Sequence, residues 1–317
     1  AYAAETDEDN VLLIDRASAY IGGVETCGEE ETLRLDKKMR EKIGMPPRDF
    51  FSAQPWTHAG AKEKIFPIVL EYRFKSEIRV QNAYLAAELA DVTEIEFNGE
   101  AIPMNVAGKY VDDAISKIAL PEISRGENSL RLHVNYHSQS SVENVMILGD
   151  FFAEKQKIEN GEKGVIAAKK AGLPWGRIDD LGYAFYGGNL TYVTKINVKH
   201  GGWLAIKAPC YKGNLIEIAV DGQKKGKILY APYKADLGKI SAGAHELRLT
   251  LYGNRFNTFG QLHNTTAVPW DGTYAWRTDG KEWSYDLLTR PVGIMRAPTY
   301  EIYAAENSTE KGGKEEK

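Results

Sequence analysis

The chain has 317 residues, of which 43% are hydrophobic and 26% are charged, and this composition excludes intrinsic disorder as a description of the whole chain. Its 40 Lys and Arg residues against 44 Asp and Glu residues leave a formal net charge of -4, so no overall basic field attracts nucleic acid or an anionic membrane. The longest nearly uncharged stretches, such as residues 65–70, are far shorter than the roughly 20 apolar residues that cross a bilayer. We therefore expect neither nucleic acid nor a membrane among the partners.

The chain opens with the residues AYAAE and turns acidic at once, so we expect no secretory signal, and the compartment stays open between extracellular and cytoplasmic. The two cysteines, Cys27 and Cys210, lie far apart, which fits neither a small disulfide scaffold nor a clustered thiolate metal site. The 6 Trp and 17 Tyr residues are more informative, because such side chains fill β-sandwich cores and also stack on sugar rings.

One helix is expected near the N-terminus, over residues 31–43, with a start at Glu29 or Thr32. Its apolar positions, Leu33, Met39 and Ile43, fall near one face, and Gly44 ahead of two prolines ends it. The run of three glutamates at 29–31 complements the positive end of the helix dipole, and we expect it to be solvated.

Short apolar or alternating runs closed by turn residues follow the helix and predict a chain that is mostly β. Asn98-Gly99 and Asp221-Gly222 favour tight reversals, because both dipeptides tolerate positive φ. We expect strands at 65–74, 94–97, 130–136, 191–198, 203–208, 216–220 and 246–252.

An internal repeat organises these strands. Residues 95–99 (IEFNG) match residues 218–222 (IAVDG), and Tyr110 and Asp113 recur as Tyr233 and Asp236 at the same offset. The motifs 70–72 (LEY) and 124–132 (SRGENSLRL) return in the same order as 190–192 (LTY) and 241–249 (SAGAHELRL), with small changes in loop length. We therefore predict an all-β fold of two tandem, homologous β-sandwiches with one short N-terminal helix.

The length agrees with two domains. We expect residues 1–60 to pack as a strand and helix segment on the first sandwich, which covers 61–154. Residues 153–180 are rich in charge and glycine and mark the junction, so the second sandwich covers 155–304. Residues 305–317 contain almost no apolar side chain and are expected to be a disordered tail.

The second copy contains the more specific motifs: residues 182–192 read GYAFYGGNLTY, and the turn at 220–222, Pro232-Tyr233 and the strand at 247–251 follow. In this order they resemble the galactose-binding-like jelly roll that forms the sugar-binding domain of family 2 glycoside hydrolases. They are also similar to the C-terminal β-sandwich region of large bacterial glycosidases of the α-L-rhamnosidase type. The resemblance covers most of the chain and includes residues 54–56 (QPW) and 148–151 (LGDF).

The resemblance implies that such sandwiches accompany a catalytic barrel of the same parent chain and do not themselves carry the acid and the nucleophile. The sequence lacks the repeated strand and helix alternation of a barrel. Two interpretations follow: a fragment of a longer bacterial enzyme, or an independent protein that has kept only the accessory part.

Carboxylate pairs for glycoside hydrolysis are not evident in the sequence. The doublets Asp112-Asp113 and Asp179-Asp180 place neighbouring side chains on opposite faces of an extended strand. One alternative stays open, an enzyme site at the domain junction that uses Asp179 or Asp180 with Glu282 or Asp286.

Metal and nucleophile patterns are also lacking, so we expect no cofactor. His133 and His137 are four residues apart but lie in a predicted strand, where this spacing has no helical metal-ligand meaning. The resemblance leaves room for a structural calcium ion held between loops by Asp, Asn and backbone oxygens.

The segment from 252 to 283 is the best candidate for a ligand site, because three of the six tryptophans lie in this predicted long loop. Aromatic platforms beside polar side chains suit sugar rings, which have apolar faces and a rim of hydroxyls. The alternative is that the rings plug the end of the sandwich or join the two domains. The candidate ligand-binding residues are Asn254, Arg255, His263, Trp270, Asp271, Tyr274, Trp276 and Trp283.

The repeat and the resemblance together imply a noncatalytic carbohydrate-recognition or scaffolding region of a glycoside hydrolase that acts on plant or microbial polysaccharide. Carbohydrate and the catalytic domain of the same parent chain are the expected partners. A glycosidase in its own right and a protein-interaction module are the two alternatives.

Overall fold

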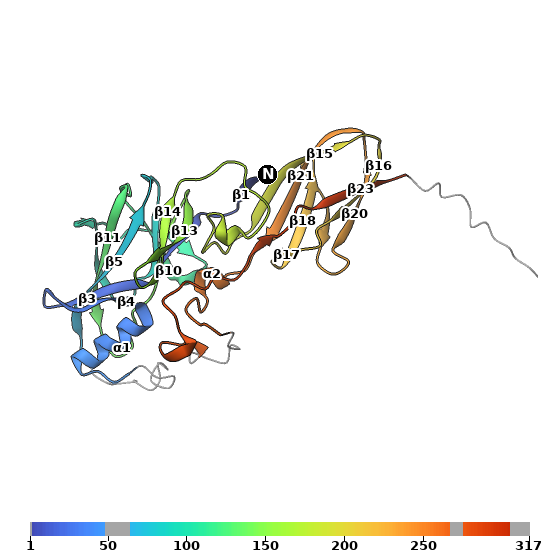
Figure 1. Ribbon diagram of the computed structural model, residues 1–317. Coiled ribbons are helices and arrows are strands. Elements are labelled where there is room, and N and C mark those ends of the chain that lie inside the picture. Colours follow the sequence, from blue (N-terminus) through green and yellow to red (C-terminus); the bar gives the residue numbers. More distant parts are fainter. Residues whose placement is uncertain (1, 48–63, 267–274, 305–317) are drawn as a thin grey trace, which may run out of the picture.

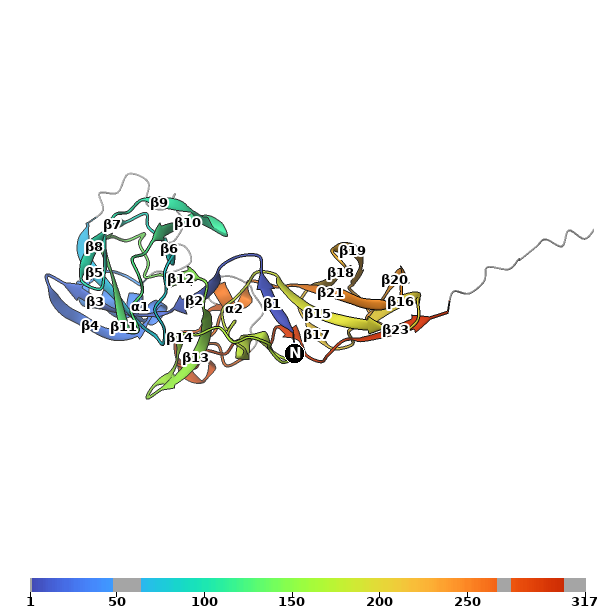
Figure 2. The same cartoon turned by 90° about the horizontal axis from the view of Figure 1, so that it is seen from above.

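The computed structural model describes residues 2–47, 64–266 and 275–304, and it is dominated by strands (Figure 1). Two β-sandwiches lie end to end, with the N-terminal and C-terminal parts of the chain crossing between them (Figure 2). The predicted all-β fold with two sandwiches and one N-terminal helix is confirmed.

The first sandwich has an eight-stranded sheet packed against a five-stranded sheet. In the larger sheet the order is β13 (Phe152–Ile158), β14 (Gly161–Ala167), β5 (Phe66–Ser76), β11 (Gly126–Tyr136), β7 (Val92–Phe97) and β8 (Glu100–Ile102), and β3 (Arg16–Ile21) pairs with β5 and with β4 (Val24–Glu31). In the smaller sheet the order is β2 (Asn10–Ile14), β12 (Val145–Gly149), β6 (Tyr84–Glu88), β10 (Asp112–Ala119) and β9 (Val106–Tyr110).

The second sandwich has a five-stranded sheet packed against a three-stranded sheet. The larger has the order β1 (Ala3–Thr6), β15 (Leu190–Val198), β21 (Gly243–Tyr252), β18 (Leu215–Val220) and β19 (Gln223–Ile228). The smaller has the order β20 (Lys234–Ile240), β16 (Gly202–Lys207) and β23 (Thr299–Tyr303), and a short pair, β17 (Tyr211–Lys212) with β22 (Gly293–Ile294), lies beside them.

The two sandwiches share a strand order, because β5-β11-β7-β8 in the first corresponds to β15-β21-β18-β19 in the second. The turns between the last two strands are also alike. Asn98 and Asp221 have φ of 51° and 48°, and the glycine after each has φ of 85° and 77°. In each turn the side-chain oxygen accepts from a backbone N–H of the neighbouring strand, Ser129 N to Asn98 Oδ1 and Glu246 N to Asp221 Oδ1, both at 2.9 Å.

The helix α1 (Thr32–Ile43) begins and ends as its sequence indicates. The Glu31 side chain accepts hydrogen bonds from the backbone N–H groups of Leu33 and Arg34, and Gly44 adopts the left-handed conformation at the C-terminal cap. Leu35 and Met39 are buried against the first sandwich. The expectation that the glutamates at 29–31 are solvated holds only for Glu29, because the side chains of Glu30 and Glu31 are buried.

Strand pairing crosses the expected domain boundaries at two places. β1 pairs with β15, so the first strand extends the second sandwich although β2 belongs to the first. The expected boundary at 154/155 falls inside β13, and the hairpin β13-β14 extends the first sandwich through the parallel pairing of β14 with β5. The described residues include no helix long and apolar enough to cross a bilayer.

Candidate functional site

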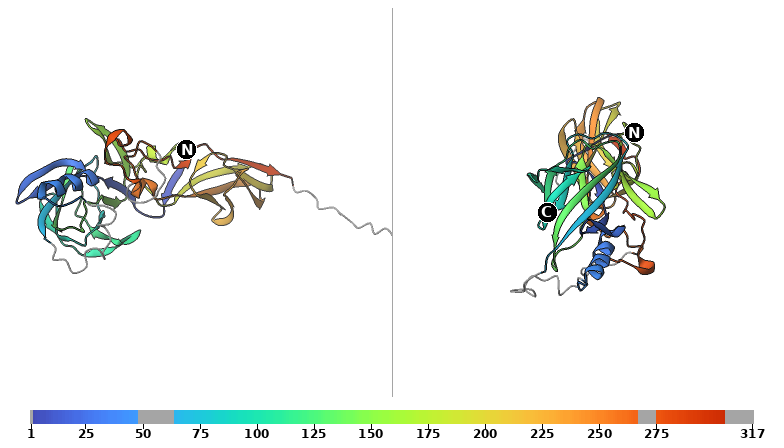
Figure 3. Two further views of the ribbon diagram at one scale, coloured as in Figure 1. Left: turned by 90° about the horizontal axis from the view of Figure 1, so that it is seen from below. Right: turned by 90° about the vertical axis from the view of Figure 1, so that its left-hand side faces the viewer.

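The segment between β21 and β22 leaves the second sandwich and packs on the first, and we call it the return segment (residues 253–292, described at 253–266 and 275–292) (Figure 3). It begins with the short helix α2 (Phe256–Phe259). Leu262 and Leu287 are 3% and 1% exposed and belong to the core of the first sandwich, and two rings of α2 pack against the same core. Apolar burial therefore holds the return segment on the first sandwich.

Two of the predicted ligand-binding residues have structural contacts at the start of this segment. Arg255 forms a bidentate ion pair with Glu8, with 2.8 Å between Nη2 and Oε2, and it also donates to the hydroxyl of Tyr110. Asn254 Oδ1 accepts from the backbone N–H of Phe256 at 3.0 Å. These contacts join the return segment to the first sandwich and fix the start of α2.

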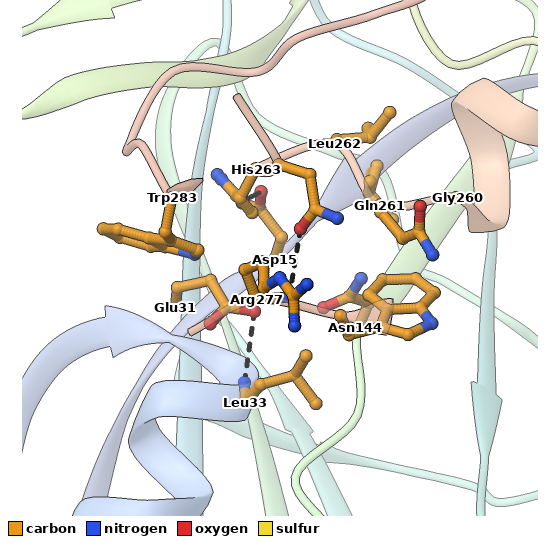
Figure 4. Close-up of a pocket in the computed structure, with 13 residues that line it drawn as sticks. Asp15, Glu31, Leu33, Asn144, Gly260, Gln261, Leu262, His263, Arg277 and Trp283 are labelled. Carbon is orange, nitrogen blue, oxygen red and sulfur yellow. Dashed lines mark hydrogen bonds and ion pairs between the residues drawn. The ribbon is translucent and has the colours of Figure 1, made fainter. Parts of the chain in front are cut away.

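A pocket lies where the return segment meets α1 and the end of β2 (Figure 4). Three predicted residues, His263, Trp276 and Trp283, line it together. The enclosed volume is about 20 Å³, enough for about one water molecule. Its other polar lining residues are Asp15, Glu31, Asn144, Gln261, Asn264 and Arg277.

His263 lies between two acceptors. Its Nε2 atom is 2.8 Å from Asp15 Oδ2, and its Nδ1 atom is 2.8 Å from the backbone oxygen of Ser284. A neutral imidazole has only one N–H, so the geometry fits the doubly protonated imidazolium. Burial acts to lower the pKa of His263, but the hydrogen bond and charge of Asp15, the charge of Glu31 and the Ser284 carbonyl outweigh it and raise that pKa.

Glu31 is the second buried carboxyl of the pocket. It caps α1 by accepting from Leu33 N at 3.2 Å and from Arg34 N at 3.1 Å. Burial raises the pKa of Glu31, against the opposing effects of the His263 charge and of the two N–H groups. The charged form is therefore less stable here than in water.

Trp283 packs on a cationic side chain of α1. The guanidinium of Arg34 lies 4.3 Å from the centre of the indole ring, and the ring of Tyr285 meets the indole edge-on at 4.4 Å. The Trp283 indole N–H is buried, and no described residue accepts from it. This tryptophan therefore contributes to the joint between the return segment and α1, although its side chain is still partly exposed.

The carboxylates of the alternative enzyme site are all engaged by cationic side chains. Buried Asp179 accepts from Arg177 Nη2 at 2.5 Å and from Val292 N at 3.2 Å, and Asp180 pairs with the same arginine. Glu282 pairs with Arg277 at 3.3 Å, and Asp286 pairs with Lys157 at 3.0 Å. Three different cations thus engage these four carboxylates.

Three of the candidate residues, Trp270, Asp271 and Tyr274, lie outside the described residues. Asp15, Glu31 and Asn144 line the pocket but were not among the candidates. One local signal pointed to Asp15: it interrupts the apolar run of residues 11–14 directly before another strand. Within residues 2–47, 64–266 and 275–304, no group of three or more His, Cys, Asp or Glu side chains is arranged to hold a metal ion.

No protein-family model and no curated protein match the chain. Solved structures with a similar arrangement include a rhamnosidase from Novosphingobium (15% identity, TM-score 0.29, covering 83% of this chain and 26% of that one). Others are a family 2 beta-galacturonidase from Eisenbergiella tayi (10%, 0.26, covering 76% and 37%) and a beta-D-mannosidase from Dictyoglomus thermophilum (12%, 0.27, covering 77% and 31%).

These structural neighbours are glycoside hydrolases, and the chain spans between 26% and 37% of their lengths. Their identities are below 25% and their TM-scores are below 0.5, so they assign no activity to this chain.

Proposed function

We propose that this chain is a noncatalytic carbohydrate-recognition and scaffolding region of a glycoside hydrolase. The observation that carries the proposal is the pocket of the return segment, where two partly exposed tryptophans, Trp276 and Trp283, stand beside hydrogen-bonding side chains. Indole rings stack on the apolar faces of sugars, and Asn144 and Arg277 are partners of the kind that hydroxyl groups need.

The size of the pocket restricts how a sugar would bind. A volume of about 20 Å³ does not admit a sugar ring, so the ring would lie across the opening against an indole face. One hydroxyl or a bridging water would then enter the pocket toward Asp15 or Asn144. Binding of this kind is shallow, and we expect affinities for single sugars in the millimolar range.

The carboxyl groups of the pocket support binding without turnover. A glycosidase needs one protonated and one ionised carboxyl, roughly 5–10 Å apart, both free to reach the substrate. Here Asp15 is engaged by His263, and both oxygens of Glu31 accept backbone hydrogen bonds. The scaffolding part of the proposal rests on the return segment. This segment follows β21 of the second sandwich, and its side chains Leu262 and Leu287 are buried in the core of the first sandwich.

One feature favours the second candidate function, a glycosidase in its own right. The raised pKa of Glu31, next to the ionisable Asp15, is the environment that a general acid requires. Hydrolysis of aryl glycosides by the intact chain, abolished by Glu31→Gln, would establish this alternative and overturn the noncatalytic proposal.

Calorimetry with rhamnose- and galactose-containing oligosaccharides at millimolar concentration tests recognition. The native chain should give a saturable heat, and Trp276→Ala should weaken or abolish it. Trp175→Phe is the matched control, because Trp175 stacks on Tyr192 inside the second sandwich at a ring distance of 5.3 Å and does not line the pocket. Absence of heat with every sugar for the native chain would overturn the recognition half of the proposal.

A further inference from the structure

An aromatic pair lies on the outer face of the three-stranded sheet of the second sandwich. The strands of this sheet, β16, β20 and β23, lie at the opposite end of the molecule from α1, which contributes to the pocket (Figure 1). Trp203 on β16 and Tyr303 on β23 are directly opposite each other in the antiparallel register. Their side chains are 43% and 42% exposed. The alternate residues Leu204, Ile206 and Ile302 point inward and pack in the core of the second sandwich. The aromatic pair therefore does not contribute to that core.

Polar neighbours fix the orientation of Tyr303. Its hydroxyl donates to Glu301 on the same strand and accepts from Lys234 Nζ at 2.9 Å. Each of these two neighbours also forms an ion pair of its own: Glu301 with Lys207 at 2.5 Å, and Lys234 with Asp236 at 3.2 Å. A ring held in this way loses little conformational entropy when a ligand stacks beside it.

The first sandwich shows that the fold does not require this exposure. β6 and β16 occupy corresponding positions in the two sandwiches. β6 lies between β12 and β10 in the first, and β16 lies between β23 and β20 in the second. Tyr84 precedes buried Leu85 as Trp203 precedes buried Leu204. The Tyr84 ring lies under the amine of Lys117 at 4.4 Å and packs against the first core. At this strand position, therefore, the exposed aromatic ring is found in the second sandwich and not in the first.

We propose that Trp203 and Tyr303 form a second binding site, which takes a neutral oligosaccharide on the outer face of the β20-β16-β23 sheet. For the class of ligand the proposal rests on the proposed function, and it adds a site remote from the return segment. The register places Lys239 beside Trp203 on one side, and Lys207, Glu301, Lys234 and Asp236 continue the same face. Cations and carboxylates alternate there, so donors and acceptors are both available to sugar hydroxyls.

The same features disfavour other occupants. The mixed charges give no single-sign field that would select a phosphate or another anion. A stable protein interface buries roughly 800 Å² on each partner around an apolar centre. Two aromatic side chains bordered by ion pairs offer much less apolar surface than this, but they match the size of one or two sugar rings.

Calorimetric titration with the neutral oligosaccharide that binds best in a glycan array tests the proposal. The native chain is expected to bind two molecules, one at each site. Trp203→Ala should lower the affinity of one site at least about tenfold and reduce the stoichiometry to one, whereas Trp203→Tyr, which keeps a ring, should retain two. Tyr230→Ala is the matched control, because Tyr230 is 79% exposed but lies in the connection from β19 to β20.

The outcomes separate this proposal from the proposed function. Loss of one site in Trp203→Ala, with a circular dichroism spectrum and unfolding midpoint like those of the native chain, supports the second site. Unchanged binding in Trp203→Ala together with loss in Trp276→Ala overturns the second site and leaves the proposed function standing. Absence of binding by the native chain overturns both. Should Trp203→Ala fail to fold, Tyr303→Ala is titrated in its place and judged by the same outcomes.

Discussion

His263 in the return segment and Asp15 at the end of β2 form an ion pair of 2.8 Å in which both side chains are buried. The two residues are separated by most of the chain, and the pair joins the segment that leaves the second sandwich to the first sandwich. Because the other ring nitrogen faces the Ser284 carbonyl, the imidazolium is the form that satisfies all three groups.

The first prediction concerns the pH dependence of stability. The pKa of His263 is raised in the folded chain, so its stabilising contribution is fully present below the usual histidine value of about 6.5 and is lost as pH rises through the raised value. His263→Asn leaves the Asp15 charge buried without its partner. Just below the usual histidine value of about 6.5, this should lower the free energy of unfolding by about 3–5 kcal/mol. The difference from the native chain should shrink as the pH increases.

Denaturant unfolding across this pH range measures the effect, with His200→Asn as a control because His200 is exposed. Comparison with the native chain cancels the contribution of His245, whose pKa is also raised, chiefly by a hydrogen bond to Asp221. A difference between native and His263→Asn that stays constant with pH would contradict an imidazolium at this position.

The second prediction concerns the N-terminal cap of α1. Glu31→Ala removes the acceptor of two backbone N–H groups and should lower the free energy of unfolding by about 1 kcal/mol. Glu31→Gln keeps one acceptor and removes a charge that burial disfavours, so near neutral pH it should be at least as stable as the native chain.

The direction of the pKa shift of Glu31 determines how the stability of the native chain changes with pH. A raised pKa of a carboxyl makes the native chain lose stability as pH rises from the usual glutamate value toward the raised one. Glu31→Gln should lack this loss, which unfolding curves measured from acid to neutral pH would reveal. A Glu31→Gln variant less stable than Glu31→Ala at neutral pH would argue against this role of burial.

The third prediction tests the packing of the return segment. Leu287 is 1% exposed in the core of the first sandwich, so Leu287→Ala should lower the free energy of unfolding by about 2–5 kcal/mol. Its neighbour Leu288 is 39% exposed, and Leu288→Ala should change that free energy by no more than about 0.5 kcal/mol. Equal effects of the two substitutions in urea unfolding would show that the segment is not anchored as described.

Local signals predicted much of the fold. The Asn98-Gly99 and Asp221-Gly222 turns require positive φ, and few other dipeptides tolerate it, so both reversals were predictable from sequence. The start of α1 at Glu31 or nearby and its end at Gly44 follow from capping chemistry in the same way. The match of Tyr110 to Tyr233 was less informative, because Tyr110 is buried and Tyr233 is 36% exposed.

Long-range relationships could not be predicted. The pairing of β1 with β15 joins segments that are far apart in sequence, and an edge strand of four residues has no pattern that selects its partner. The burial of Glu30 and Glu31 was missed because a run of acidic residues is normally solvated, and their partners come from distant segments. Tyr285 donates to Glu30 at 2.8 Å, and His263 lies near enough to Glu31 to affect its pKa.

The candidate site was predicted in part. Aromatic clustering drew attention to Trp276 and Trp283, and the structure brings them together with His263. Arg255 looked equally suitable for a ligand, but its partner Glu8 lies near the N-terminus, and no local pattern connects the two residues. The sequence interpretation left both a sugar platform and a joint between domains open. Trp283 contacts Arg34 of α1 and Tyr285 of its own segment, and the first of these contacts is of the kind that a joint requires.

Calorimetry of the intact chain with a neutral oligosaccharide, recorded long after each injection, tests the central claim most directly. Binding without turnover gives heats that saturate and a thermal power that returns to the baseline, and this is the result we predict. Hydrolysis would give a sustained thermal power that persists while substrate remains. That sustained signal, if a single substitution such as Glu31→Gln or Asp15→Asn abolished it, would contradict the claim that this chain recognises carbohydrate without cleaving it.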